Sequence, residues 1–293
     1  MRARGSDQYE SILELIPDNW SDPKDSLAQV EAKFAMVHGQ DPGPGVAIEP
    51  DDHGVWVRPA DGHDDRVVVF AHGGGFVTSP AESYTFWGAH VARNCGLAVL
   101  IVDYRLAPAT TFPGQLDDLA AAHDAVLDTG TAADRIVFMG DSCGGGLAVG
   151  TMLTQRDRGR PQPAAFAGLG GWYDLEATGV ESPWPDPFVD PDWLRLRGHD
   201  YVGPDGDSAD PRASVVNASL VGLAPMLLQT GEVDPCLPGA EVLARHAIRD
   251  GVAVEVEVIP AVAQGFQGMG GVPEADQAWA AVRRFIDARV APG

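Results

Sequence analysis

The stretch Val137–Gly150, "VFMGDSCGGGLAVG", decides the fold. A short apolar run ends at G-D-S-C-G (residues 140–144), and small and apolar residues follow. This is G-x-S-x-G between a predicted strand and a predicted helix, where a tight, strained turn lifts the serine hydroxyl clear of the sheet. The pattern predicts Ser142 as a nucleophile; a plain strand-to-helix turn with a serine cap is the alternative.

Outward from this turn, short runs rich in Val and Ile alternate with longer segments of helical periodicity. That alternation is typical of a parallel sheet covered by helices. Strands are expected near Val55, Val68, Leu100, Val137, Phe166, Leu227 and Val254. Helices are expected over residues 86–94, 115–127, 145–156, 239–249 and 274–289. We find no fixed-period repeat, so one α/β domain over residues 1–293 is predicted.

Two stretches interrupt the alternation. Residues 1–45 indicate one or two helices that end in the breaker run "GQDPGPG". Residues 172–211 are dense in Pro, Asp and Trp, and an insertion of that length in a compact domain is often a functional lid. Its aromatic residues Trp184, Phe188 and Trp193 suggest an apolar substrate pocket, with packing inside the lid as the alternative.

A second glycine-rich motif follows the predicted strand near Val68. In "VVVFAHGGGFV" the residues His72, Gly73, Gly74 and Gly75 come directly after an apolar run, and the glycines expose backbone N–H groups. Together with the N–H of the residue after Ser142, such donors can stabilise a tetrahedral oxyanion. The other readings are a simple turn or a phosphate loop, but neither G-K-[ST] nor G-x-G-x-x-G follows.

With both motifs, the chain resembles the hormone-sensitive-lipase-like family of α/β-hydrolases, the esterases with an HGGG loop and a GDSxGG elbow. The segment "YRLAPATTFPGQLDD" (residues 104–118) is similar to a further family motif, with Ala109 where glutamate is common. The resemblance implies the α/β-hydrolase fold: a mostly parallel, eight-stranded sheet flanked by helices. It also implies a helical cap built from residues 1–45 and about 172–211.

The resemblance also assigns roles. Ser142 would be the nucleophile of a carboxylic ester hydrolase acting on small to medium apolar esters or lactones, through an acyl-enzyme. Gly73, Gly74 and Cys143 would be the oxyanion-hole donors. His72 would orient the loop rather than act as a base.

The acid of the triad is expected at Asp234, after the strand "PMLLQTG". The order Ser, Asp, His along the chain is also what this fold requires. Glu232 is a weaker candidate because it falls within the turn, and an Asx turn before Pro235 is the structural alternative for Asp234.

The histidine of the triad is missing. In "IPAVAQGFQGM" (residues 259–269), Gln264 stands where the family has histidine, and no histidine follows His246. His246, on a predicted helix, and His199, in the lid, are poor substitutes. Glutamine hydrogen-bonds but has no proton affinity near neutral pH, so the chain is expected to be an impaired hydrolase.

Three explanations stay open at this point. The chain is an esterase whose histidine was replaced, or a non-hydrolytic enzyme such as a lyase, decarboxylase or cyclase that uses the same oxyanion pocket, or a catalytically dead ligand-binding homologue. An intact elbow, oxyanion loop and acid favour a catalytic scaffold.

The amino-acid composition excludes several classes of binding partner. The formal net charge is −22, from 42 acidic and 20 basic residues, which argues against nucleic acids and anionic membrane surfaces. The three cysteines are scattered and no metal-ligand spacing occurs, so neither a metal nor a cofactor is expected. No signal-peptide or membrane-spanning pattern is found, which makes cytoplasmic the default location. Relatives often dimerise, so a homodimer stays open.

Overall fold

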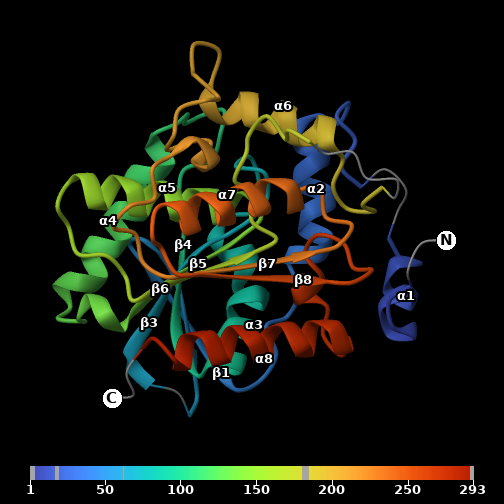
Figure 1. Cartoon of the computed structure of the whole chain (residues 1–293). Coiled ribbons are helices and arrows are strands. Elements are labelled where there is room, and N and C mark those ends of the chain that lie inside the picture. Colours follow the sequence, from blue (N-terminus) through green and yellow to red (C-terminus); the bar gives the residue numbers. More distant parts are fainter. Residues whose placement is uncertain (1–3, 17–19, 62, 180–184, 291–293) are drawn as a thin grey trace.

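The computed structural model describes residues 4–16, 20–61, 63–179 and 185–290 (Figure 1). The strands are β1 (Val46–Asp51), β2 (Gly54–Pro59), β3 (His63–Ala71), β4 (Leu97–Val102), β5 (Ile136–Asp141), β6 (Ala165–Leu169), β7 (Met226–Gly231) and β8 (Val254–Ile259). The helices are α1 (Asp7–Leu13), α2 (Leu27–His38), α3 (Thr85–Cys95), α4 (Gly114–Asp128), α5 (Cys143–Asp157), α6 (Pro191–Val202), α7 (Leu237–Arg249) and α8 (Pro273–Asp287).

The eight strands form one sheet in the order β1-β2-β4-β3-β5-β6-β7-β8. β1 pairs with β2 and β2 with β4 in antiparallel fashion, and every other pair is parallel. The predicted mostly parallel sheet is confirmed. The edge strand β1 was not predicted, because its side chains are largely exposed and it contains Pro50, so no apolar run marks it.

Helices cover both faces of the sheet. Figure 1 shows α3 and α8 below it and α4, α5 and α7 above it. Alternate residues of β3 serve the two layers: Val67 and Val69 join the core under α4, α5 and α7, whereas Val68 and Phe70 join the core under α3 and α8. The central strands are therefore buried on both faces, which makes the carboxyl edge of the sheet a rigid platform.

The two segments that were predicted to form a cap contact each other. Phe34 of α2 stacks on Trp193 of α6 with ring centroids 5.8 Å apart, and the Asp190 amide donates to the Ser21 hydroxyl over 2.6 Å. Helix α6 itself was not predicted, although Asp190 caps its N-terminus and Pro191 occupies its first turn, both ordinary start signals.

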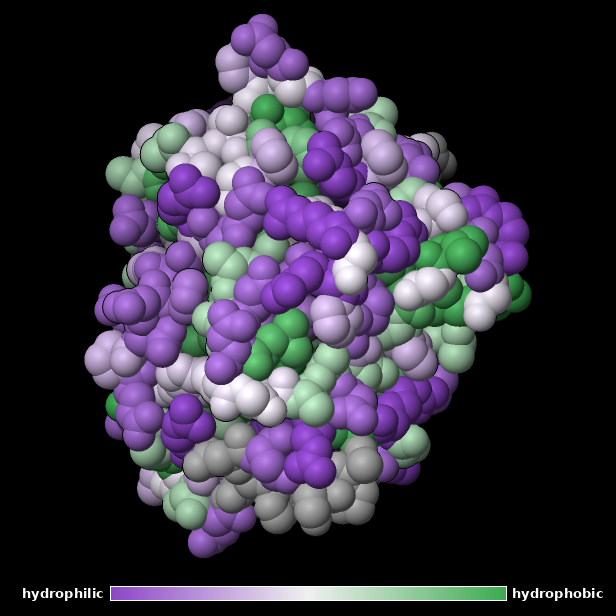
Figure 2. Space-filling model, turned by 90° about the vertical axis from the view of Figure 1, so that its left-hand side faces the viewer, coloured by the Kyte–Doolittle hydropathy of each residue, from purple (hydrophilic) through white to green (hydrophobic). Residues whose placement is uncertain are grey.

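One face of the molecule is mostly hydrophilic. Figure 2 shows the face that carries α4 as mostly hydrophilic, with hydrophobic residues confined to small, separate patches. Within the part of the chain that the structure describes, no helix is long and apolar enough to cross a membrane.

Candidate active site

Ser142 sits on a strained turn between β5 and α5. Its backbone has φ 52° and ψ −123°, a conformation that residues other than glycine rarely adopt. A Cβ on Gly144 would lie 2.0 Å from the Ala71 carbonyl oxygen, so only glycine lets α5 pass this close to β3. The glycine spacing of the motif therefore has a steric cause, and the elbow predicted at this place is present.

The elbow opens into a cavity of about 610 Å³. Ser142, Gly74 and Gln264 line it together. Apolar side chains of the N-terminal segment and of the 172–211 stretch form much of the remaining wall, among them Ile12, Leu15, Ile16, Trp20, Phe34, Met36, Val37, Phe188, Val189 and Trp193. Phe188 and Trp193 thus lie where an apolar pocket was expected, while Trp184 lies outside the described residues.

His72 is fully buried beside the glycine loop. Its Nδ1 donates to the Gly73 carbonyl over 2.8 Å, its ring stacks on Tyr104 at 4.1 Å, and the Tyr104 hydroxyl donates to the His72 carbonyl. Burial lowers the pKa of His72 to about 4, so the imidazole is neutral at neutral pH. These contacts suit a residue that fixes the loop.

The predicted oxyanion donors are not equally placed. Gly74 lines the cavity and has φ 104°, and a Cβ there would lie 2.5 Å from the Thr78 carbonyl oxygen. Gly73 and Cys143 are not among the residues that line the cavity. Gly73 is enclosed: a Cβ on it would meet Asp141 at 2.4 Å and Tyr84 at 2.6 Å.

The thiol of Cys143 has a contact that sequence reasoning missed. The Phe76 amide donates to its Sγ over 3.2 Å, which ties the glycine loop to the first turn of α5. Burial raises the pKa of this thiol to about 12, so it remains protonated. The side chain therefore holds two parts of the site together, in addition to any role of its amide.

Asp234 follows β7 and is buried behind Gln264. Its Oδ1 accepts from the Cys236 amide over 2.7 Å and its Oδ2 from the Thr230 hydroxyl over 3.0 Å. Burial raises the pKa of Asp234 well above its usual range, and the nearby charge of Asp186 adds to the increase. Asp234 thus lies beside residue 264, and within the described part of the chain no ion pair joins it to a cation.

Gln264 lies against Gly170. Its Nε2 donates to the Gly170 carbonyl over 3.0 Å, while its buried Oε1 has no hydrogen-bond partner among the described residues. A Cβ on Gly170 would lie 2.6 Å from that Oε1 and 3.0 Å from Oδ2 of Asp234, so both side chains approach the same side of Gly170. Within the described chain, no hydrogen bond joins Gln264 to the Ser142 hydroxyl.

Two neighbouring acids have other tasks. Oε2 of Glu232, the weaker acid candidate, accepts from the Ala261 amide over 2.8 Å and so supports the loop after β8. Oδ2 of Asp186 accepts from the Gln264 backbone amide over 2.7 Å. A residue of the 172–211 stretch therefore fixes the loop that carries Gln264.

One imidazole that lines the cavity was missed by sequence reasoning. His38, at the end of α2, lines the same cavity as Ser142, whereas His199 and His246 do not. Its Nδ1 lies 2.8 Å from the Ser79 hydroxyl and its ring 4.4 Å from the Tyr84 ring. Burial, followed by the influence of His72, lowers the pKa of His38 to about 3, which makes it a weak base. No local sequence signal separates it from an ordinary histidine at a helix end.

Asp141 adds a buried carboxyl to the cavity wall. Its Oδ2 accepts from the Tyr84 hydroxyl over 2.8 Å, and its Oδ1 has no partner among the described residues. Burial raises the pKa of Asp141 to about 7, although the Tyr84 hydroxyl opposes this. A carboxyl with this pKa is about half ionised at neutral pH.

Asp141→Asn should stabilise the fold increasingly as pH rises. The carboxyl has a pKa of about 3.9 in the unfolded chain and about 7 in the fold. The destabilising effect of this carboxyl is absent below about pH 4, grows as pH rises from about 4 to 7, and is constant above that. We expect a melting temperature about 5–10 °C above the unchanged protein at pH 8 and little difference at pH 4.5. Asp128→Asn, at an exposed position, is the control; a gain independent of pH would contradict the assignment.

A serine on a strained elbow, at the carboxyl edge of a mostly parallel sheet and lining a cavity, defines an α/β-hydrolase type of site. A family model described as the α/β hydrolase fold matches residues 68–268. The chain belongs to that family, and the predicted fold class is confirmed.

Individual relatives match over nearly the whole chain. An acetyl-hydrolase of Streptomyces hygroscopicus is 30% identical over 266 residues, which cover 87% of each chain. An ethyl acetate hydrolase of Pseudomonas putida is 31% identical and covers 91% of this chain and 90% of its own. The crystal structure of an esterase from the bacterial hormone-sensitive lipase family superposes with a TM-score of 0.92 at 30% identity, covering 99% of this chain and 100% of that one.

Proposed function

We propose that Ser142 attacks the carbonyl of a small to medium apolar ester or lactone, and that the chain does so weakly because Gln264 occupies the place of the general base. The chain is a carboxylesterase-type hydrolase. One observation carries the proposal furthest: Ser142, Gly74 and Gln264 line one cavity, with Asp234 buried behind them.

The nucleophile and the oxyanion site support acyl transfer. The strained elbow exposes the Ser142 hydroxyl to the cavity, and the Cys143 amide, at the start of α5, has no acceptor within its helix. Donors at Gly73, Gly74 and Cys143 would stabilise the tetrahedral oxyanion, a contribution of several kcal/mol in related chemistry. Water would then release the acid from the acyl-enzyme.

The missing step is proton transfer. A serine hydroxyl needs a base to accept its proton and later to protonate the leaving group. The Gln264 amide cannot do either, and it is held by the Gly170 carbonyl. His38 and Asp141 also line the cavity, but a histidine with a pKa of about 3 is a weak base, and the Asp141 carboxyl is engaged by Tyr84.

The cavity wall supports an apolar substrate. Apolar side chains of the two predicted cap segments form much of the lining, and Phe86, Trp87 and Met269 extend it. The names of the relatives point to acetyl groups and ethyl acetate as their substrates. A short acyl group at Ser142, with the larger apolar part of the ester toward Phe34 and Trp193, fits both observations.

Covalent labelling tests the nucleophile. Prolonged incubation with a fluorophosphonate should add one phosphonyl group to the unchanged protein, slowly because no base assists, and peptide mapping should place it on Ser142. Intact-mass spectrometry measures the adduct, with Ser142→Ala as the control. Labelling that persists in Ser142→Ala, or that maps to another serine, would overturn the assignment.

A further inference from the structure

A second cavity, of about 360 Å³, lies away from the site of Ser142 and shares no lining residue with it. Arg66 near the start of β3 and Gly96 just before β4 both line it, so it sits at the amino edge of the parallel strands. Ser142 follows the carboxyl end of β5. The two cavities therefore open at opposite edges of the sheet.

Arg66 is the unusual residue of this cavity. It is 8% exposed, and its buried Nε has no hydrogen-bond partner among the described residues. The carboxylate oxygen that pairs with it belongs to Asp287 and lies 4.0 Å from Nη1, at the limit of an ion pair. A buried Nε–H without a partner, on an arginine whose ion pair is this long, is costly, and an anion in the cavity would offset part of that cost.

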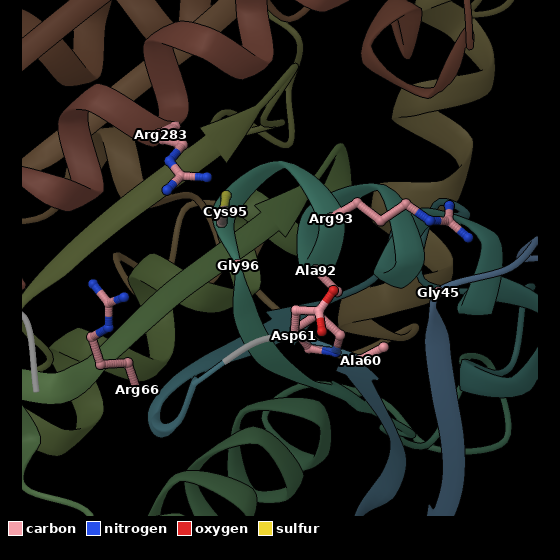
Figure 3. Close-up of a pocket in the computed structure, with 10 residues that line it drawn as sticks. Gly45, Ala60, Asp61, Arg66, Ala92, Arg93, Cys95, Gly96 and Arg283 are labelled. Atoms are coloured by element: carbon pink, nitrogen blue, oxygen red, sulfur yellow. The ribbon is translucent and has the colours of Figure 1, made fainter.

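Two more arginines border the same space (Figure 3). Arg283 of α8 donates to Asp287 over 3.3 Å and to the Asn94 carbonyl over 3.2 Å. Arg93 of α3 donates to the carbonyls of Pro42 and Pro44. In Figure 3, Arg66 and Arg283 stand on one side of the site and Arg93 on the other. Their hydrogen bonds hold the guanidinium groups in place and leave further N–H groups unused.

The local charge is opposite to that of the chain. Among the described residues, Arg66, Arg93 and Arg283 line this cavity together with one carboxylate, Asp61, and a second carboxylate, Asp287, lies beside it. This leaves an excess positive charge in a protein with 42 acidic and 20 basic residues. An acidic surface repels anions in general, so an anion would bind here only if specific side chains are positioned to hold it.

We propose that this cavity binds a phosphate group, free or as the monoester of a small molecule. Planar guanidinium groups donate paired N–H bonds to phosphate oxygens, and arginine is preferred for that task. The apolar walls at Pro59, Ala60 and Ala92 leave room for a small organic remainder. No step of the proposed ester hydrolysis uses this cavity, so the inference is independent of that function.

Calorimetric titration tests the proposal. Sodium phosphate and glycerol 3-phosphate are titrated separately into the full chain at constant ionic strength, with sodium acetate as a carboxylate probe. Melting temperatures are recorded over the same concentrations. The variants are Arg66→Met, Arg283→Met and, as the matched control, Arg245→Met, which removes an exposed arginine of α7. Arg283 is half exposed, so its variant keeps the test valid if Arg66→Met fails to fold.

We expect saturable phosphate binding in the unchanged protein and in Arg245→Met, with a rise in melting temperature of about 5 °C at a hundredfold excess over Kd. Affinity should fall at least tenfold in Arg66→Met and Arg283→Met. A higher affinity for glycerol 3-phosphate than for phosphate would identify a phosphate monoester as the ligand, and equal affinities would identify free phosphate. No saturable binding of either probe, equal affinity in all variants, or a preference for acetate would overturn the proposal.

Discussion

Gln264→His should raise the hydrolysis rate of p-nitrophenyl acetate at least a hundredfold. The substitution places an imidazole at position 264, which lines the cavity with Ser142 and lies near Asp234, and we expect this imidazole to accept the serine proton and return it to the leaving group. General acid–base catalysis of this kind contributes about 10²–10⁴-fold. The remaining parts of the site are already present: the elbow, the glycine loop and a buried acid next to residue 264. Steady-state kcat/KM at pH 7.5 measures the gain.

Two control variants distinguish a gain that comes from the basic imidazole from one that comes only from a change in side-chain shape. Gln264→Asn keeps an amide without a base and should stay at or below the unchanged rate. Ser142→Ala combined with Gln264→His should return to background. If histidine adds nothing while the protein stays folded, the site has been rebuilt around glutamine. A lyase, decarboxylase or cyclase, or a ligand-binding role, would then replace the proposed hydrolysis.

Asp234→Asn should be tolerated in the Gln264 background and strongly deleterious in the Gln264→His background. With Gln264 in place, burial raises the pKa of Asp234 well above its usual range and so disfavours the carboxylate, and an uncharged amide of the same shape should therefore be tolerated. With histidine at 264, the carboxylate must orient and stabilise the imidazolium. Its loss there should cost on the order of 10³–10⁴-fold in kcat/KM. The double-mutant cycle measures this coupling.

The pH dependence of stability tests the interaction between residues 234 and 264 without an activity assay. A carboxyl whose pKa is raised by folding costs nothing at low pH and destabilises the fold as pH rises toward the folded pKa. Asp234→Asn in the Gln264 chain should therefore raise the melting temperature at pH 8 and change it little at pH 4.5. Equal destabilisation in both backgrounds, at every pH, would show that a charged Asp234 supports the fold regardless of residue 264.

The parts of the structure that could be predicted are those with local signals. The elbow at Ser142 and the glycine loop at Gly74 each require glycine for a steric reason, so the glycines in the sequence are enough to predict their backbone geometry. The buried strands are apolar on both faces, which gives continuous Val and Ile runs. β1 and α6 were missed because one is exposed along its length and the other lies in a stretch dominated by Pro and Asp.

The remaining parts of the site depend on tertiary contacts. His38 reaches the cavity from α2, more than a hundred residues before Ser142, and nothing in its neighbourhood marks it. The bond from the Phe76 amide to the Cys143 thiol joins two motifs that sequence reasoning treated separately. Contacts between residues far apart in the sequence, such as these, are set by tertiary packing and cannot be read from the spacing of residues in a motif. The catalytic roles assigned by resemblance stay predictions until the variants are measured.

The bond between Asp186 and the Gln264 amide limits how this scaffold can be recombined. Exchanging residues 172–211 for the corresponding insertion of a relative would remove the acceptor that positions the loop after β8. A chimera would then inherit a new substrate wall together with a displaced residue 264. Position 186 and the 264 loop should therefore be transferred as one unit when specificity is redesigned.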